Sequence, residues 1–217
     1  MINNLKGVIF DFNGTLFFDN DKHVKAWGAI SNQIRGHGIS QNELHSKFNG
    51  VPNNEIIKYM KPDATTEDLK KYSSLKEEYY RKFCFEDKPS FHLVKGSEQY
   101  FDKLTQEKIP FTIASASIKP NIDFFIESFN LDHWIKPENI IYDDGSYDNK
   151  VKMFKEAAKV INCDLKDILI IEDSVSGIKN AYKAGCQNII VVDSANKKDE
   201  YQKLPGVIKV INDFTQI

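Results

Sequence analysis

The sequence predicts an α/β fold in which a doubly wound, Rossmann-like parallel sheet carries an inserted all-helical domain. Short apolar runs rich in β-branched residues or phenylalanine indicate buried parallel strands. Amphipathic stretches between these runs indicate helices, and strands that alternate with helices are typical of a parallel sheet. One long segment near the N-terminus contains no strand-like run, which indicates a separate helical unit.

The predicted strands are short and are followed by polar residues. They span residues 7–10, 111–114, 168–171 and 189–192, with a fifth and a sixth candidate at 139–142 and 207–210. The helices predicted between them span residues 97–108, 119–129, 151–161 and 175–184, and Gly185 is placed to end the last one as a C-cap.

The helical insertion follows the first strand and spans residues 19–89, so that the core domain comprises residues 1–18 and 90–217. Apolar residues at helical spacing predict helices at 23–35, 53–60 and 67–85, and glycine and proline residues separate them.

Composition restricts the class of protein. The chain has 217 residues, 41% of them hydrophobic and 28% charged, with a net charge of −2, so it lacks the basic excess that nucleic-acid binding usually needs. Cys84, Cys163 and Cys186 are too few and too widely spaced for a disulfide framework or a zinc site. No signal peptide or membrane-length apolar run is apparent, so we expect a cytoplasmic protein without a membrane partner, either a monomer or a weak homodimer.

Polar residues that follow the predicted strands point to one functional edge of the sheet. In open α/β sheets, ligands bind outside the carboxyl ends of the strands. The first strand is followed by Asp11, the second by Ser115, and the strand at 168–171 by Glu172 and Asp173. Carboxylates gathered there suit Mg²⁺, which prefers oxygen ligands.

Phosphoryl oxygens could be bound by the neighbouring groups: the Ser115 hydroxyl, the backbone N–H of Ala116 and a lysine such as Lys150. Each group also has a structural interpretation. A strand-ending Asp or Ser can cap the next helix, and a single lysine is often a solvated surface residue.

Three motifs resemble those of the haloacid dehalogenase-like superfamily of phosphatases and phosphomutases, and the resemblance covers nearly the whole chain. Asp11-Phe12-Asn13-Gly14-Thr15 is similar to the family's D-x-D-G-T motif, and Ser115 to its second motif. Glu172-Asp173-Ser174-Val175-Ser176-Gly177-Ile178 matches its fourth motif, E-D-S-x-x-G-I.

The resemblance implies that Asp11 forms an aspartyl-phosphate. It implies that Mg²⁺ is bound by Asp11, the backbone carbonyl of Asn13 and Asp173, with Glu172 in or near the metal shell. The third motif is less complete, because the family's lysine is usually followed by Pro. Lys150 is the first choice for this lysine, and Lys152 is the alternative.

Asn13 is the main departure, because the family normally has a second Asp there that transfers protons. Asparagine cannot do this, and the loss of a positioned acid–base group typically costs about 10²–10⁴ in rate. The asparagine is consistent with a natural protein of reduced or redirected activity, with a substitution introduced into the sequence, or with compensation by a residue such as His23 or Asp19.

The insertion resembles the helical cap of this superfamily, which closes over the active site and selects the substrate. His23, Trp27, Gly50, Val51 and Lys76 are similar to the cap pattern of β-phosphoglucomutase, although Trp27 and Val51 also fit a helical core. Asn53 stands where that pattern has an arginine that grips the distant phosphate, and this loss favours a phosphatase over a mutase.

We therefore predict a magnesium-dependent phosphatase acting on a small phosphorylated metabolite such as a sugar phosphate. The alternatives are a β-phosphoglucomutase-like mutase and a sugar-phosphate-binding protein that has lost turnover; a receiver-type signalling domain is disfavoured by the long insertion. The predicted catalytic residues are Asp11, Asn13, Ser115 and Lys150; the substrate-binding residues are Thr15, His23, Trp27, Gly50, Val51, Asn53, Lys76, Ala116 and Ser117; and the metal-binding residues are Asp11, Asn13, Glu172 and Asp173.

Overall fold

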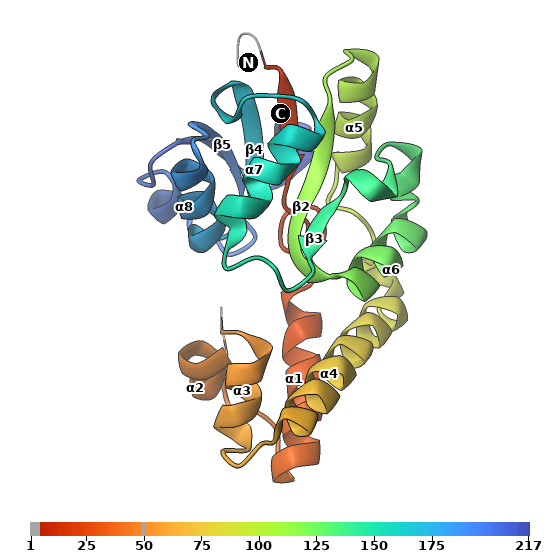
Figure 1. Ribbon diagram of the computed structural model, residues 1–217, viewed down its shortest axis with the longest axis vertical. Helices are drawn as coiled ribbons and strands as arrows, with labels where there is room; N and C mark the ends of the chain where they lie inside the picture. The colour runs from red at the N-terminus through yellow and green to blue at the C-terminus, as the bar shows by residue number, and fades with distance from the viewer. Residues whose placement is uncertain (1–4, 49–50) are drawn as a thin grey trace. The chain divides into compact units, whose positions relative to one another are not determined.

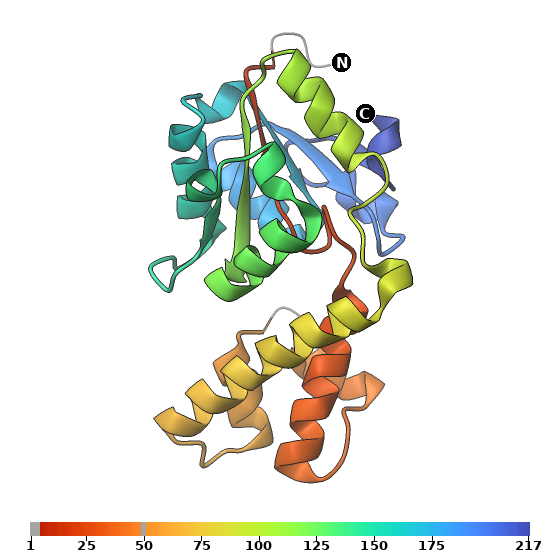
Figure 2. The same ribbon diagram turned by 90° about the vertical axis from the view of Figure 1, so that its right-hand side faces the viewer.

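The computed structural model describes residues 5–48 and 51–217, apart from the side chain of His45. The chain divides into two compact units, Met1–Phe18 with His92–Ile217 and Asp19–Phe91, and each is described by itself (Figures 1 and 2). Within the described residues, the first unit contains a six-stranded parallel sheet of order β3-β2-β1-β4-β5-β6 with helices on both faces. The second unit is helical throughout its described part. The predicted fold class is therefore confirmed.

The core elements lie close to the predicted ranges. The strands are β1 Gly7–Phe10, β2 Phe111–Ile118, β3 Ile141–Asp143, β4 Ile168–Glu172, β5 Asn188–Val192 and β6 Val207–Ile211. The helices are α5 Ser97–Gln106, α6 Lys119–Phe129, α7 Lys150–Val160, α8 Val175–Ala184 and α9 Lys198–Tyr201, with 3₁₀ turns at Leu131–His133, Pro137–Asn139, Leu165–Asp167 and Phe214–Gln216.

Strand β1 occupies the centre of the sheet, between β2 and β4. Its side chains alternate between the two faces. Ile9 belongs to the cluster that includes Ala157 of α7 and Ala181 of α8, whereas the ring of Phe10 lies 5.1 Å from that of Phe101 on α5. Figure 2 shows α5 and α6 together on one side of the sheet. Because both faces are covered, the strand is apolar throughout, as the sequence indicated.

Strand β2 is four residues longer than the apolar run that predicted it. The added part, Ser115 to Ile118, alternates serine with alanine and isoleucine and is partly exposed, but it remains extended because Ala114 and Ile118 pair with Ile141 and Asp143 of β3. Backbone pairing thus overrides the local composition at this end of the strand.

The helical unit contains α1 Asn20–Arg35, α2 Gln41–Glu43, a π-helix at Leu44–Phe48, α3 Asn53–Met60, α4 Thr66–Glu86 and a 3₁₀ turn at Lys88–Ser90. Its core is formed by Trp27, Ile30, Phe48, Ile56, Ile57 and Met60. The buried ammonium of Lys22 lies 2.8 Å from Asp87 Oδ2, which ties the start of α1 to the end of α4.

Helix α2 and the π-helix were not predicted, because neither is long enough for a helical period to emerge in the sequence. A local signal was present nonetheless. Ser40 and Glu43 form a capping box, in which the backbone N–H of Glu43 donates to Ser40 Oγ and that of Ser40 donates to Glu43 Oε2.

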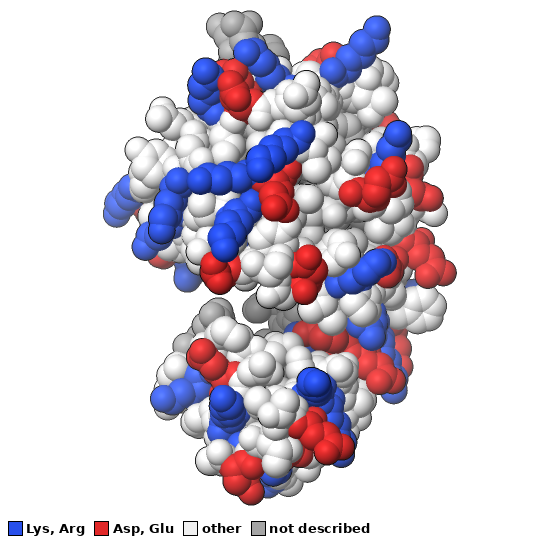
Figure 3. Space-filling model, in the orientation of Figure 1, with Lys and Arg blue, Asp and Glu red and all other residues white. Residues whose placement is uncertain are grey.

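Charged side chains of both signs are interspersed over the face shown in Figure 3, in keeping with the small net charge of the chain. Among the helices in the described part of the chain, none combines the length and the apolar character that crossing a membrane requires.

Candidate active site at the carboxyl ends of the strands

Asp11 lies at the end of β1, and its side chain is buried, with 3% of the residue exposed. Its backbone N–H donates to the carbonyl of Ile171 on β4, 2.9 Å away, so the residue remains within the parallel ladder. Thr15 Oγ1 donates to Asp11 Oδ2 at 3.1 Å. Thr15, which was predicted to bind substrate, is fully buried, and its hydroxyl orients the carboxylate of Asp11.

The turn after Asp11 depends on Gly14, whose φ is +79°, a conformation that side chains disfavour. A Cβ atom at Gly14 would lie 2.2 Å from Asp173 Oδ2. Glycine therefore allows the loop after β1 and the loop after β4 to approach, which brings Asp173 beside Asp11.

Lys150 begins α7, where Asn149 acts as the N-cap by accepting a hydrogen bond from the backbone N–H of Val151. Lys150 Nζ lies 2.5 Å from Asp11 Oδ1 and 2.6 Å from Glu172 Oε1. Lys152 instead points outward and pairs with Asp148, with 58% of its side chain exposed. Of the two lysines that the sequence left open, only Lys150 reaches the cluster around Asp11.

Burial and pairing act in opposite directions on the charges of this cluster. Burial raises the pKa of Asp11, and the nearby Lys150 lowers it, with a net result of about 6. For Lys150, burial would lower the pKa, but the carboxylates of Asp11 and Glu172 outweigh burial and raise it. Near neutral pH the arrangement therefore keeps Lys150 protonated and Asp11 mostly ionised.

Glu172 is fully buried and holds the loop after β4. Its Oε2 accepts hydrogen bonds from the backbone N–H groups of Asp173 and Ser174 and from Ser174 Oγ, and its Oε1 accepts from Lys150. A Cβ atom at Gly177 would lie 1.9 Å from Oε1, so only glycine leaves room for this carboxylate. The glycine of the fourth motif thus has a packing role.

Asp11, Glu172 and Asp173 each offer a carboxylate oxygen, and these atoms lie within 4.8 Å of one another. Such hard oxygen donors fit a divalent cation of the magnesium type. The two oxygens of Glu172 accept four hydrogen bonds from neighbouring groups, whereas each oxygen of Asp11 accepts one, from Lys150 or Thr15, so Glu172 is the more fully engaged of these two carboxylates.

Asn13 contacts two hydroxyl groups at the end of β2. Its Oδ1 accepts a hydrogen bond from Ser117 Oγ at 2.7 Å and from Ser115 Oγ at 3.3 Å. The backbone N–H of Ser117 also donates to Ser115 Oγ, at 3.1 Å, and the intervening Ala116 is exposed. The structure therefore brings Asn13, Ser115 and Ser117 together beside Asp11.

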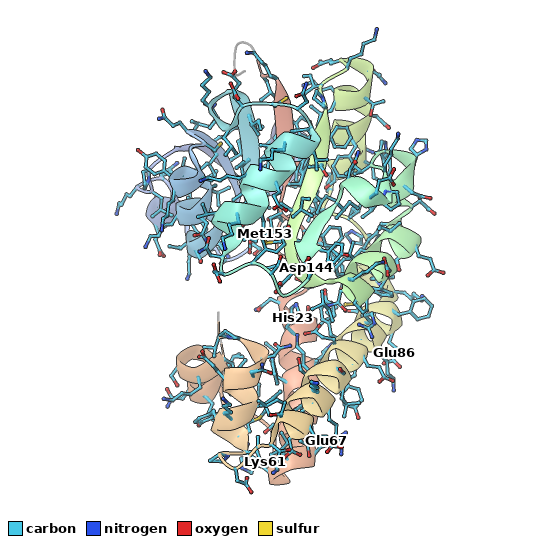
Figure 4. The ribbon with its side chains drawn as sticks, in the orientation of Figure 1. His23, Lys61, Glu67, Glu86, Asp144 and Met153 are labelled. Atoms are coloured by element: carbon cyan, nitrogen blue, oxygen red, sulfur yellow. The ribbon has the colours of Figure 1, made fainter. Side chains whose placement is uncertain are left out.

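A second polar cluster lies wholly within the helical unit. His23, near the start of α1 (Figure 4), lies with its Nε2 3.3 Å from Asp19 Oδ2. Its Nδ1 faces Lys76 Nζ at 2.9 Å, and its ring stacks on that of Tyr80. The hydroxyl of Tyr80 donates to the same Asp19 oxygen. Because an ammonium group can only donate, Nδ1 is the acceptor and Nε2 carries the hydrogen.

Lys76 also connects this cluster to Asn53 through Glu77, which was not among the predicted site residues. Lys76 Nζ and Asn53 Nδ2 donate to Glu77 Oε1, at 2.8 and 2.9 Å. Lys76 and Glu77 are 3% and 7% exposed. In the sequence, only the position of Glu77 next to Lys76 could have pointed to this residue. The contacts between α1, α3 and α4 that bring it to Asn53 depend on tertiary structure.

The remaining predicted positions in the helical unit are apolar or lie outside the described residues. Trp27 is buried in the core of this unit, and Val51 packs against that core. Gly50 lies outside the described residues.

Comparison with known proteins places this site in a family. The model of the haloacid dehalogenase-like hydrolases matches residues 8–191. A solved HAD hydrolase of family IA, variant 3, from Entamoeba histolytica HM-1:IMSS is 31% identical, with a TM-score of 0.91 over 98% of this chain and 95% of that one. The chain therefore belongs to the haloacid dehalogenase-like hydrolases, as the motifs indicated.

More distant structures share the fold across different activities. A β-phosphoglucomutase from Clostridium difficile is 20% identical, with a TM-score of 0.75 over 98% of this chain and 93% of that one. A predicted phosphoglycolate phosphatase from Haemophilus somnus 129PT is 14% identical, with a TM-score of 0.77 over 100% of this chain and 97% of that one. The fold accommodates mutases and phosphatases alike, so the chemistry must be argued from the side chains.

Proposed function

We propose that this hydrolase is a magnesium-dependent phosphatase that acts on a small phosphorylated metabolite, with sugar phosphates as the first class to test. The observation that carries the proposal is the environment of Asp11. Its buried carboxylate is oriented by Thr15 and paired with Lys150, and Asp173 lies beside it. The fixed carboxylate of Asp11 lies next to the ammonium of Lys150 and within the candidate cation site. Positive charge at both places would allow this carboxylate to attack an anionic phosphate.

In the proposed reaction, one oxygen of Asp11 forms a bond to phosphorus while the bond from phosphorus to the leaving oxygen breaks. Water then attacks the same phosphorus atom, and the aspartyl-phosphate bond breaks to release phosphate. Lys150 stabilises the charge on the phosphoryl oxygens, and so does the hydroxyl of Ser115 once it turns from its 3.3 Å contact with Asn13 Oδ1. Asp11, Asp173 and the backbone carbonyl of Asn13 would hold Mg²⁺, which when bound neutralises charge on the nucleophile and the phosphate.

The polar cluster of the helical unit supports a phosphatase over a mutase. A mutase must grip a second phosphate, which calls for a cation with hydrogen-bond donors to spare. The charge of Lys76 is balanced by the adjacent Glu77, and Asn53 donates to that same carboxylate. Neither residue therefore offers the positive charge that a bisphosphate needs.

The test is release of inorganic phosphate from a panel of sugar phosphates, acyl phosphates and other small phosphorylated metabolites, with and without Mg²⁺. We expect release that requires Mg²⁺ and is absent in Asp11→Asn. Interconversion of hexose monophosphates in the presence of a bisphosphate, with little phosphate release, would instead identify a mutase.

Asn13 motivates a second candidate function, a binding protein that has lost turnover. Saturable, magnesium-dependent binding of a sugar phosphate without phosphate release over hours would favour this function. Rapid multiple turnover would exclude it.

A further inference from the structure

The hydrogen bonds of Asn13 define what this residue can do in the reaction. A carbonyl oxygen has two lone pairs, and the oxygen of Asn13 accepts hydrogen bonds from Ser117 Oγ and Ser115 Oγ. The only side-chain hydrogens that can form polar contacts are those of the amide nitrogen. An amide can donate them in a hydrogen bond but does not release them as protons near neutral pH. Asn13 can therefore stabilise a leaving oxygen but cannot protonate it.

The titratable groups described next to Asp11 have other roles and do not replace the missing acid. Lys150 Nζ is held between two carboxylates, 2.5 Å from Asp11 Oδ1 and 2.6 Å from Glu172 Oε1. Both oxygens of Glu172 accept hydrogen bonds from the protein. Asp173 belongs to the candidate cation site. The nucleophile is thus intact, whereas the proton carrier is absent from this cluster.

Resting on the phosphatase function proposed above, we propose that the preferred phosphoryl donors are acyl phosphates and that the phosphorylated form of Asp11 is long-lived. In the first step, an oxygen of Asp11 bonds to phosphorus, and the bond from phosphorus to the acyl oxygen breaks. The electron pair leaves with a carboxylate anion, which is stable without a proton. An alkyl phosphate such as a sugar 6-phosphate would have to release an alkoxide, which needs the proton that Asn13 cannot supply.

The second step is slow for the same reason. Water must lose a proton as it attacks phosphorus, and Asn13 cannot accept one. Loss of a positioned acid–base group typically slows a step by about 10²–10⁴. The aspartyl-phosphate therefore forms faster than it is hydrolysed, and phosphorylated protein accumulates.

The experiment follows the intact mass of the full chain in Mg²⁺ with acetyl phosphate or with glucose 6-phosphate. With acetyl phosphate, we expect the native protein to gain the mass of one phosphoryl group, and Asp11→Asn to gain none. After removal of the donor, the phosphorylated form should decay about 10²–10⁴ times more slowly than that of Asn13→Asp. Lys152→Gln, altered on the surface of α7, should behave as the native protein does.

Two results would overturn the inference while leaving the phosphatase function intact. One is rapid multiple turnover of acetyl phosphate by the native protein without any gain in mass. The other is that glucose 6-phosphate phosphorylates or turns over as fast as acetyl phosphate. If neither the native protein nor a folded Asn13→Asp variant gains a phosphoryl group or releases phosphate from either donor, the inference and the phosphatase function both fail.

Discussion

Lys150 lies between two buried carboxylates, and replacing it tests how the candidate site is held together. Its ammonium is 2.5 Å from Asp11 Oδ1 and 2.6 Å from Glu172 Oε1. Asp11 is 3% exposed and Glu172 is 0% exposed. Lys150→Met keeps most of the apolar stem and removes the charge. Removing one partner of a buried ion pair costs about 3–5 kcal/mol, because the other charge stays buried. At about 2–4 °C per kcal/mol, the melting temperature should fall by roughly 6–20 °C.

The same substitution should have a characteristic pH dependence. Burial raises the pKa of Asp11 and Lys150 lowers it, so without Lys150 the folded-state pKa of Asp11 lies further above that of the unfolded chain and the folded protein binds this proton more tightly. The destabilisation is then largest above the folded-state pKa values and shrinks as the pH falls towards the unfolded values near about 4. Thermal denaturation followed by circular dichroism at pH 8 and pH 5 measures both effects.

Lys152→Met is the matched control on the same helix. Its side chain is 58% exposed and pairs with an exposed Asp148, and such surface pairs contribute little to stability, so the melting temperature should not change. If Lys150→Met is as stable as the native protein at pH 8, or its loss of stability is the same at both pH values, the argument that Lys150 compensates two buried charges is refuted.

Three further predictions follow from the site. Asn13→Asp should raise multiple turnover on alkyl phosphates by about 10²–10⁴, measured as phosphate release, and an unchanged rate would contradict the role assigned to Asn13. Gly177→Ala should displace Glu172, lower the melting temperature and abolish phosphate release. The control is Gly28→Ala on α1, where an added Cβ atom would have no neighbour within 4 Å. This variant should leave turnover unchanged and raise the free energy of unfolding by up to about 1 kcal/mol. In metal-free protein, the raised pKa of Asp11, about 6, means that the folded state binds its proton more tightly, so the free energy of unfolding should fall as the pH rises from about 4 through 6. Urea denaturation at several pH values measures this fall, which Asp11→Asn should lack. If the free energy of unfolding changes equally with pH in the two proteins, the prediction is wrong.

The sheet and its functional edge could be predicted from the sequence because both depend on local patterns. The apolar runs marked β1, β4 and β5 to within a residue, and a parallel sheet places the carboxyl ends of its strands along one edge. The polar residues after the apolar runs of β1, β2 and β4 were therefore expected to meet, and the structure brings them together. Backbone pairing with β3 extended β2 beyond its apolar run, which composition could not reveal.

The choice between Lys150 and Lys152 required tertiary structure. Residues two apart on a helix do not share a face, so only one of these lysines can point towards β1. The N-cap at Asn149 sets where α7 begins, and packing of the helix on the sheet sets its rotation. Neither is fixed by the spacing of the lysines in the sequence.

The roles of Lys76 and Asn53 were likewise decided by tertiary contacts. Lys76 lies 53 positions from His23 and Asn53 lies 24 positions from Glu77, yet these pairs are in hydrogen-bond contact. The sequence by itself determined the fold class, the family motifs and the candidate nucleophile, because strand and helix periods and contiguous motifs are local. Only the tertiary structure decided which charges neutralise one another, because ion pairing depends on distances between segments that the chain order does not specify.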